Sequence, residues 1–127
     1  MAVVDFKFLG LNLSTIQNII WANLSGSDTG NPFTLAAHSD KTVHVYGTYS
    51  GATLVLQGSN DPRANPDHPD HASADWQTLV DFLGSAISFT SNDIVQILDN
   101  TLYVRPVVVG GDGDTDLSVS VVGKKVK

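Results

Sequence analysis

A period of two in the apolar side chains constrains the fold more than any other feature of this sequence. Over residues 41–49 the apolar side chains, Val43 and Val45 among them, alternate with polar ones. Such alternation is typical of a β-strand with one buried face. The step Ser50–Gly51 suits a tight turn, and a second apolar run follows at residues 54–57. The pattern therefore predicts that these two strands form a hairpin.

The C-terminal part of the chain repeats this signal. Residues 102–109 and 117–122 are rich in Val and are separated by a segment of Gly and Asp. They predict two strands joined by a plain hairpin loop. Pro106 falls inside the first of these strands, and because proline cannot donate a ladder hydrogen bond, it predicts an edge strand or a bulge. Strand character also resumes at residues 76–80.

The composition favours strands over long helices. The 127 residues include thirteen Asp, no Glu and one Met, whereas Glu, Lys, Met and Ala usually fill exposed helix faces. One short helix is predicted, because Ser91 is a candidate N-cap and Ile94, Ile97 and Leu98 follow at helical spacing. We therefore predict an all-β fold: a single-domain β-sandwich or jelly roll over residues 1–127, with one short helix and an extended N-terminal segment.

The N-terminal segment is unusually apolar for a chain terminus. An extended arm can add main-chain hydrogen bonds to a sheet edge of a neighbouring subunit while its side chains fill pockets. Residues 1–13 are therefore a possible intersubunit arm. The alternative is that the segment forms the first strand of its own sandwich. The predicted partner-binding side chains are Val4, Phe6, Phe8, Leu9 and Leu11.

Charge and missing residue types exclude several classes of function. The net charge is −6 and the isoelectric point is near 4.7, which argues against nucleic-acid binding because phosphate contacts need a basic face. Without Cys the chain forms no disulfide and no thiolate metal site. No apolar run approaches the length of a membrane span, and the N-terminus lacks the features of a signal peptide. We expect no membrane association.

Two Asp-rich segments are candidate metal sites. Asp67–His71 holds two His and two Asp, which suit a borderline divalent cation. It lies in an exposed loop predicted over residues 63–75, which has no rigid element to fix ligands. Asp112–Asp116 alternates carboxylates as calcium loops do, but the chain has no Glu for bidentate ligation. We interpret the first as a solvated loop and the second as a plain hairpin loop, with weak cation binding as the alternative for the second. Because catalytic motifs are also missing, we expect no cofactor and no enzyme activity.

Two segments resemble a pattern common in small structural proteins of tailed-bacteriophage virions. The first is Val43 to Asp61, VHVYGTYSGATLVLQGSND, followed by Trp76-Gln77-Thr78-Leu79. The second is Leu102 to Leu117, LYVRPVVVGGDGDTDL. A shorter match covers Trp21 to Pro32. The insertion at Pro62 to Asp75 departs from the pattern, in which the turn before the tryptophan is usually short.

The resemblance implies a non-enzymatic capsid decoration, or cement, protein on the surface of the virion, made in the host cytoplasm. Its partners would be the major capsid protein and further copies of itself, as a dimer or trimer. A tail or baseplate component is the nearest variant. The pieces LQGSND, W-x-x-L and YVRP are also similar to discoidin-type jelly rolls. They leave an alternative function open: a carbohydrate-binding module of a phage tail or surface protein, with Trp76 or Tyr49 as the stacking surface.

Overall fold

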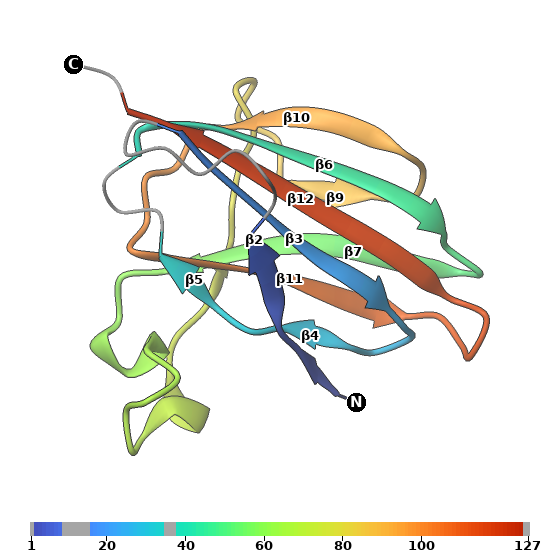
Figure 1. Ribbon diagram of the computed structural model, residues 1–127, viewed down its shortest axis with the longest axis horizontal. Coiled ribbons are helices and arrows are strands. Elements are labelled where there is room, and N and C mark those ends of the chain that lie inside the picture. Colours follow the sequence, from blue (N-terminus) through green and yellow to red (C-terminus); the bar gives the residue numbers. More distant parts are fainter. Residues whose placement is uncertain (1, 9–15, 35–37, 126–127) are drawn as a thin grey trace.

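Two β-sheets packed face to face form the protein (Figure 1). The computed structural model describes residues 2–8, 16–34 and 38–125. The strands are β1 (Val3–Val4), β2 (Phe6–Phe8), β3 (Ile16–Leu24), β4 (Thr29–Gly30), β5 (Phe33–Thr34), β6 (Asp40–Thr48), β7 (Ala52–Ser59), β8 (Gln77–Thr78), β9 (Ser88–Phe89), β10 (Asp93–Ile97), β11 (Tyr103–Gly110) and β12 (Asp116–Lys124).

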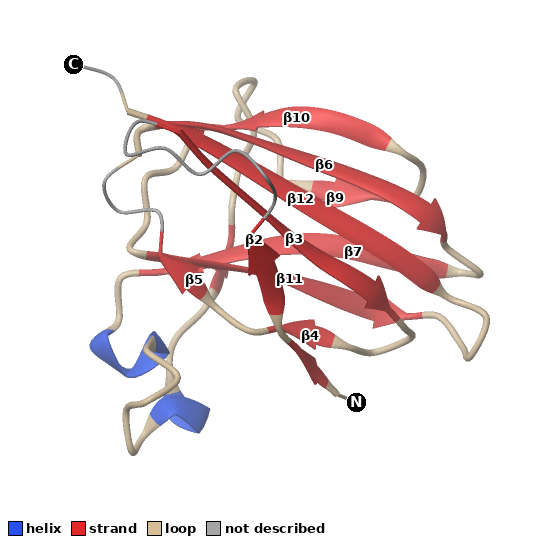
Figure 2. Cartoon of the chain, viewed as in Figure 1, coloured by secondary structure: helices blue, strands red, loops and turns tan. Residues whose placement is uncertain are grey.

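The strands divide into a five-stranded and a seven-stranded sheet. The five-stranded sheet has the order β10-β6-β12-β3-β2. The seven-stranded sheet has the order β1-β4-β11-β7-β8, with β5 paired to β11 and β9 paired to β7. This arrangement confirms the predicted all-β sandwich (Figure 2). Within the described ranges, no helix is long and apolar enough to span a membrane.

The core lies between the sheets and follows the period-two pattern of the sequence. In β12, Leu117, Val119 and Val121 are fully buried, whereas the serines between them are half-buried. Burial of one such side chain stabilises the fold by about 2 kcal/mol. Trp21 of β3 is also fully buried, and its Nε1–H donates to the Asn31 carbonyl over 2.9 Å. The largest core side chain therefore has its polar group satisfied.

The hairpin predicted between β6 and β7 is wrong. The tight turn does form, because the Ala52 N–H donates to the Tyr49 carbonyl over 2.9 Å and Ser50 and Gly51 take φ values of 47° and 81°. However, β6 pairs with β10 and β12, whereas β7 pairs with β11 in the other sheet. Alternation marks the buried face of a strand, and it is the same for strands that lie side by side or face each other across a core.

The hairpin loop predicted between β11 and β12 is wrong for the same reason, since these strands also lie in different sheets. The two sheet-to-sheet connections contact each other. The Thr115 hydroxyl donates to the Tyr49 carbonyl over 2.9 Å, and the Ser50 hydroxyl donates to Asp112 Oδ1 over 2.8 Å. Hydrogen bonds between the two loops therefore close this end of the sandwich.

The irregularity predicted at Pro106 is present, although β11 is not an edge strand. On the β4–β5 side the pairing shifts by one residue beside Pro106, with Val107 opposite Thr29 and Val104 opposite Phe33. β11 is an interior strand, and its register with β7 is continuous, with Pro106 opposite Leu56. The Val108 N–H donates to the Asp28 carbonyl on the β4 side. Because alternate residues of a strand direct their backbone groups to the same neighbour, Pro106 faces that side too. On that side β4 ends at Gly30 and β5 begins at Phe33. No strand residue between them needs a backbone N–H from position 106, so the missing N–H of proline is tolerated.

The helix predicted at residues 91–98 is wrong as well, because residues 93–97 form β10 and pair with β6. Ile97 is buried, whereas Ile94 and Leu98 are 58% and 49% exposed. The three apolar side chains therefore do not share one buried face. Pairing with β6 outweighs the weak local preference for a helical turn. In the part of the chain that the structure describes, the helical elements are the 3-10 turns η1 (Pro62–Ala64) and η2 (His71–Ser73).

Candidate interaction surface

The N-terminal strands, which hold the predicted partner-binding residues, pair with strands of the same chain. Val4 lies opposite Gly30 in a parallel pair of β1 with β4. Phe6 lies opposite Trp21 in the pair of β2 with β3, so the segment passes from one sheet to the other. Val4 and Phe6 are half-buried against the core, and Phe8 is 56% exposed. The described residues do not include the other two predicted side chains, Leu9 and Leu11.

Aromatic rings fix β2 against the sandwich. Phe6 makes edge-to-face contacts with Phe33 and Trp21, with ring centroids 4.7 Å and 6.1 Å apart. Phe8 and Phe33 are 5.8 Å apart in the same kind of contact. Each edge-to-face pair stabilises by about 1 kcal/mol beyond the area it buries. Residues 3–8 thus serve the fold of their own chain. A role as an intersubunit arm stays a prediction, and Val3 and Phe8, 67% and 56% exposed, are the large apolar side chains that the fold leaves open there.

Two strongly exposed apolar side chains lie together on a tight turn. Phe82 is 66% exposed and Leu83 is 89% exposed. Asp81 organises this turn, because its Oδ1 accepts hydrogen bonds from the N–H groups of Leu83, at 2.9 Å, and Ser85, at 3.0 Å. Its carbonyl accepts from the Gly84 N–H, and Gly84 takes a φ of 83° that glycine adopts without strain. We call Phe82 and Leu83 the apolar tip.

The base of this turn is fixed to both sheets. Asp81 forms a β-bridge with Ile97 at the end of β10, and the Leu98 N–H donates to the Val80 carbonyl over 3.0 Å. On the other side, β8 and β9 pair with β7. The neighbouring edge strand β10 adds Ile94, which is 58% exposed. The apolar tip is therefore held in solvent by backbone hydrogen bonds, which lowers the entropy lost when a partner covers it.

Sequence reasoning did not identify the apolar tip, although a signal was present. Asp81 and Gly84 are both turn-forming residues, and they flank two large apolar side chains. A turn lies on the surface, so apolar side chains at its centre have no core to enter. This combination would have distinguished the tip from the strands on either side.

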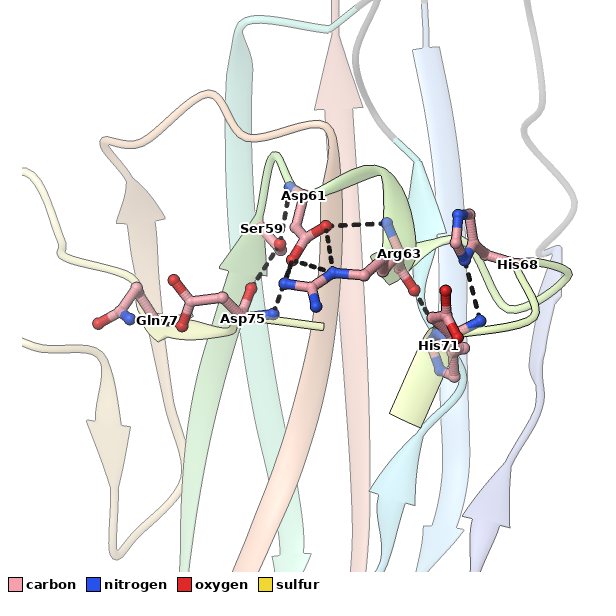
Figure 3. Close-up of polar contacts among 8 residues, drawn as sticks. Ser59, Asp61, Arg63, His68, His71, Asp75 and Gln77 are labelled. Carbon is pink, nitrogen blue, oxygen red and sulfur yellow. Dashed lines mark hydrogen bonds and ion pairs between the residues drawn. The ribbon is translucent and has the colours of Figure 1, made fainter. Parts of the chain in front are cut away.

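A second loop, over residues 59–77, is polar and is organised by Asp61 (Figure 3). The Asp61 carboxylate accepts hydrogen bonds from the Arg63 N–H at 2.9 Å and the Asp75 N–H at 3.0 Å. It also forms an ion pair with the Arg63 guanidinium at 2.7 Å. The Arg63 side chain first, and then these backbone donors, hold the pKa of Asp61 well below its ordinary value of 3.8. We call this segment the Asp61 loop.

The histidine side chains of the first candidate metal segment contact backbone groups of the Asp61 loop. His68 Nδ1 accepts from the Asp70 N–H over 3.0 Å, and His71 Nδ1 lies 2.9 Å from the Arg63 carbonyl oxygen. Across residues 2–8, 16–34 and 38–125, no three His or Asp side chains are grouped to hold a metal ion. Two 3-10 turns and the contacts of Asp61 order a segment that the sequence predicted to lack rigid elements.

The second candidate metal segment is closed by its own hydrogen bonds. Asp112 Oδ1 accepts from the Ser50 hydroxyl and from the Asp114 N–H, each over 2.8 Å. The Ser50 contact is the largest of the causes that lower the pKa of Asp112. The Asp112 N–H in turn donates to the Thr115 hydroxyl. These contacts join the loop to the neighbouring sheet-to-sheet connection.

An open pocket of about 450 Å³ lies beside the Asp61 loop, and three of its lining side chains are Asp61, Asp75 and Asp99. Each carboxylate already accepts hydrogen bonds from its surroundings. Asp75 Oδ1 accepts from the Gln77 side chain over 2.9 Å, and Asp99 Oδ2 accepts from the Val80 N–H over 2.8 Å. The carboxylates thus support the loops that form the pocket.

The two aromatic side chains considered for sugar stacking are engaged by their own chain. The Arg105 guanidinium lies 4.0 Å from the centroid of the Trp76 ring and covers one face of it. Arg105 Nε also donates to Gln57 Oε1 over 3.0 Å. Tyr49 packs against the core, and its hydroxyl is buried. Carbohydrate binding therefore stays a prediction without a specific supporting contact.

Comparisons with known proteins establish the fold. No family model matches the chain, and no curated protein matches it. Among solved structures, the SPBc2 prophage-derived protein YomS is similar with a TM-score of 0.60 and 12% identity, over 90% of this chain and 98% of that chain. A cupin superfamily protein from Desulfitobacterium hafniense has a TM-score of 0.47 and 6% identity, over 95% of this chain and 78% of that chain. At 12% identity the likeness to the prophage-derived protein is one of fold.

Proposed function

We propose that this chain is a non-enzymatic structural protein of a tailed-phage virion, which stabilises the capsid by binding the lattice of the major capsid protein. It would be made in the host cytoplasm and would act on the capsid surface. The observation that carries the proposal is the apolar tip, with Leu83 89% exposed on a turn that Asp81 organises. Apolar side chains that are held away from the core favour a protein partner.

Two further findings support a phage particle as the place of action. The sequence pattern of Val43 to Asp61 and of Leu102 to Leu117 resembles small virion proteins. The fold is shared, over nearly the full length of both chains, with a prophage-derived protein. Neither finding identifies the partner, which is why the proposal depends on the apolar tip.

Self-association is supported by the two edges of the five-stranded sheet. β2 lies at one edge and carries Phe8, and β10 lies at the other edge and carries Ile94. Exposed edge strands readily pair with another chain. Contact between unlike edges is head-to-tail, and it closes into a ring when the rotation permits. A twofold dimer instead joins like edges, so the two edges allow either a dimer or a trimer.

The proposal is tested with phage that lacks this protein. Such particles should assemble but lose resistance to heat, low salt or internal DNA pressure. Purified wild-type protein added to them should sediment with the heads and restore resistance. The double variant Phe82→Ser, Leu83→Ser should do neither. Unchanged resistance of the particles, together with absence of the protein from purified wild-type heads, would overturn the proposal.

A matched control separates the apolar tip from exposed apolar surface in general. Val109 is 54% exposed at the end of β11, outside the tip. Val109→Ser should therefore bind heads as the wild type does. If both variants lose binding equally, the interaction is not specific to the tip. Thermal unfolding of each variant should match the wild type, because exposed side chains contribute little to the core.

The edge contact is tested separately through the mass of the protein in solution. Phe8→Ser and Ile94→Ser each replace an exposed apolar side chain at one edge of the five-stranded sheet. Either change should weaken a head-to-tail ring, whereas an interface that joins like edges should respond to only one of them. Analytical ultracentrifugation across a range of concentrations measures this. A wild-type protein that remains monomeric throughout would contradict self-association.

A further inference from the structure

A buried lysine lies at the start of β6, outside the surface described above. Lys41 is 1% exposed, and removal of an ammonium group from water is costly without a compensating partner. Its Nζ donates to the His38 carbonyl over 3.1 Å and to Asn100 Oδ1. Within the described ranges Lys41 forms no ion pair, because the pair found there joins Arg63 to Asp61. The amine is therefore held by two neutral acceptors.

This environment raises the share of the neutral amine, which is its nucleophilic form. Burial lowers the pKa of Lys41 and outweighs the opposing effects of Asp40 and Asp99. A lysine that loses its proton in an apolar setting becomes a nucleophile toward a carbonyl carbon. The surrounding groups thus supply one of two requirements for reaction with an amide.

The second requirement is an amide carbon within reach of that amine. The contact between Nζ and Asn100 Oδ1 places the Asn100 Cγ one covalent bond beyond the hydrogen-bonded oxygen. Asn100 lies in the connection from β10 to β11, which passes the start of β6 (Figure 1). Holding both groups on fixed elements gives the proximity that makes an intramolecular reaction fast. Asn100 is exposed, so a small leaving group can escape to solvent.

Asp99 provides a group for proton transfer. It is the chain neighbour of Asn100, and its charge acts on Lys41. The hydrogen bond from the Val80 N–H to Asp99 Oδ2 holds the carboxylate in place over 2.8 Å. A nearby carboxylate can accept a proton from an attacking amine and deliver it to a departing one.

From this juxtaposition we propose that Lys41 and Asn100 form an intramolecular isopeptide bond. The lone pair of the neutral Lys41 Nζ attacks Asn100 Cγ, and a Nζ–Cγ bond forms as the Cγ–Nδ2 bond breaks. One proton passes from Nζ to Nδ2 through the Asp99 carboxylate, and ammonia leaves. No oxidant, reductant or further reactant is consumed. The product is a secondary amide that joins β6 to the β10–β11 connection.

The bond would tie the five-stranded sheet to the connection that enters the seven-stranded sheet. It would close a covalent loop from residue 41 to residue 100 and so restrict the unfolded chain, as a disulfide does in a protein with Cys. It does not depend on the proposed capsid function. Its consequence is resistance of the folded protein to heat.

Mass spectrometry of the intact, folded chain tests the proposal. The wild type should be lighter than its sequence by the mass of one ammonia molecule, and digestion should yield a peptide pair linked through Lys41 and Asn100. Asn100→Ser should have its full sequence mass and a lower unfolding temperature. A folded wild-type protein at its full sequence mass overturns the proposal.

Two carboxylate variants test the assignment of the proton carrier. Asp99→Asn keeps an oxygen to accept from the Val80 N–H but removes the base, so the folded variant should have its full mass. Asp40→Asn removes the other carboxylate that acts on Lys41 and should still lose ammonia. Circular dichroism establishes that each variant is folded. Formation of the isopeptide bond in Asp99→Asn would overturn the role of Asp99. Absence of the bond from both variants would show that bond formation depends on negative charge near Lys41 and not on proton transfer by Asp99.

Discussion

The Asp61 loop and the turn that carries the apolar tip use the same local device and present opposite surfaces. In each, one carboxylate accepts hydrogen bonds from two backbone N–H groups further along the chain, those of Arg63 and Asp75 in the first and those of Leu83 and Ser85 in the second. The Asp61 loop then uses its remaining polar groups internally, in an ion pair and in contacts of two histidines. The turn presents its apolar side chains to solvent.

The difference teaches that order and exposure are separate properties of a loop. Hydrogen bonds order both segments, so poor structure does not explain the exposure of either one. A polar loop that satisfies its own donors and acceptors is complete in water. In an ordered turn, two large apolar side chains exposed to solvent are unfavourable in free energy. This cost is removed only when a partner covers them. Variants of the two aspartates should therefore have different consequences.

The largest effect is expected for Asp61→Ala on the order of its loop. The change removes the acceptor of two backbone donors and the partner of Arg63. Limited proteolysis should cut the variant within residues 62–74 much faster than the wild type. Binding to phage heads should be unchanged. Equal rates of cleavage in the two proteins would show that the ion pair and the backbone hydrogen bonds of Asp61 do not order the loop.

Asp81→Ala should reverse this pattern. The turn loses the acceptor of the Leu83 and Ser85 N–H groups, so the apolar tip must be ordered when the partner binds. We expect affinity for heads to fall by about tenfold, because side-chain and loop ordering costs on the order of 1 kcal/mol for each immobilised group. The unfolding temperature should change little. Loss of stability with unchanged affinity would break the comparison between the two loops.

Much of the fold could be predicted from the sequence, and the misses have one physical origin. Alternation correctly marked the buried face of β6, and apolar runs correctly indicated strands at β7, β11 and β12. Neither signal contains information on which strands are neighbours. The tight turn at Ser50 and Gly51 formed as predicted while the strands it joins separated into different sheets. Pro106 could be accommodated only because β4 and β5 leave a gap beside it. Such facts depend on tertiary pairing.

The candidate surface was less predictable than the fold. The sequence identified apolar residues at the N-terminus, and the structure shows that Phe6 packs on Trp21 and Phe33 of the same chain. Apolar character alone does not tell a side chain that the fold buries from one that it leaves for a partner. That distinction needs the exposed fraction of each side chain, which for the apolar tip follows from its position in a turn.

Acid should affect the Asp61 loop through its carboxylate. The pKa of Asp61 is lowered by folding, so the unfolded chain binds more protons and the contribution of this group to stability rises with pH. The contribution is complete above the ordinary value of 3.8 and is lost as the pH falls below it toward the lower folded value. Asp61→Asn should therefore narrow the difference in unfolding temperature between pH 6 and pH 3. An unchanged difference would contradict the lowered pKa.

The smallest effect is expected for Gly84→Ala, with Gly51→Ala as its matched control. Gly84 and Gly51 have φ values of 83° and 81°, and an added Cβ meets nothing within 4 Å at either position. Each substitution should therefore lower the free energy of unfolding by about 1 kcal/mol, because an L-residue is strained in this conformation. Only Gly84→Ala should also weaken binding to heads, since Gly84 shapes the turn of the apolar tip. Gly51 lies in the β6–β7 connection, so its variant reports backbone strain alone. If the two variants weaken binding equally, the loss follows from stability, and the geometry of the turn that Asp81 and Gly84 form does not matter to the partner.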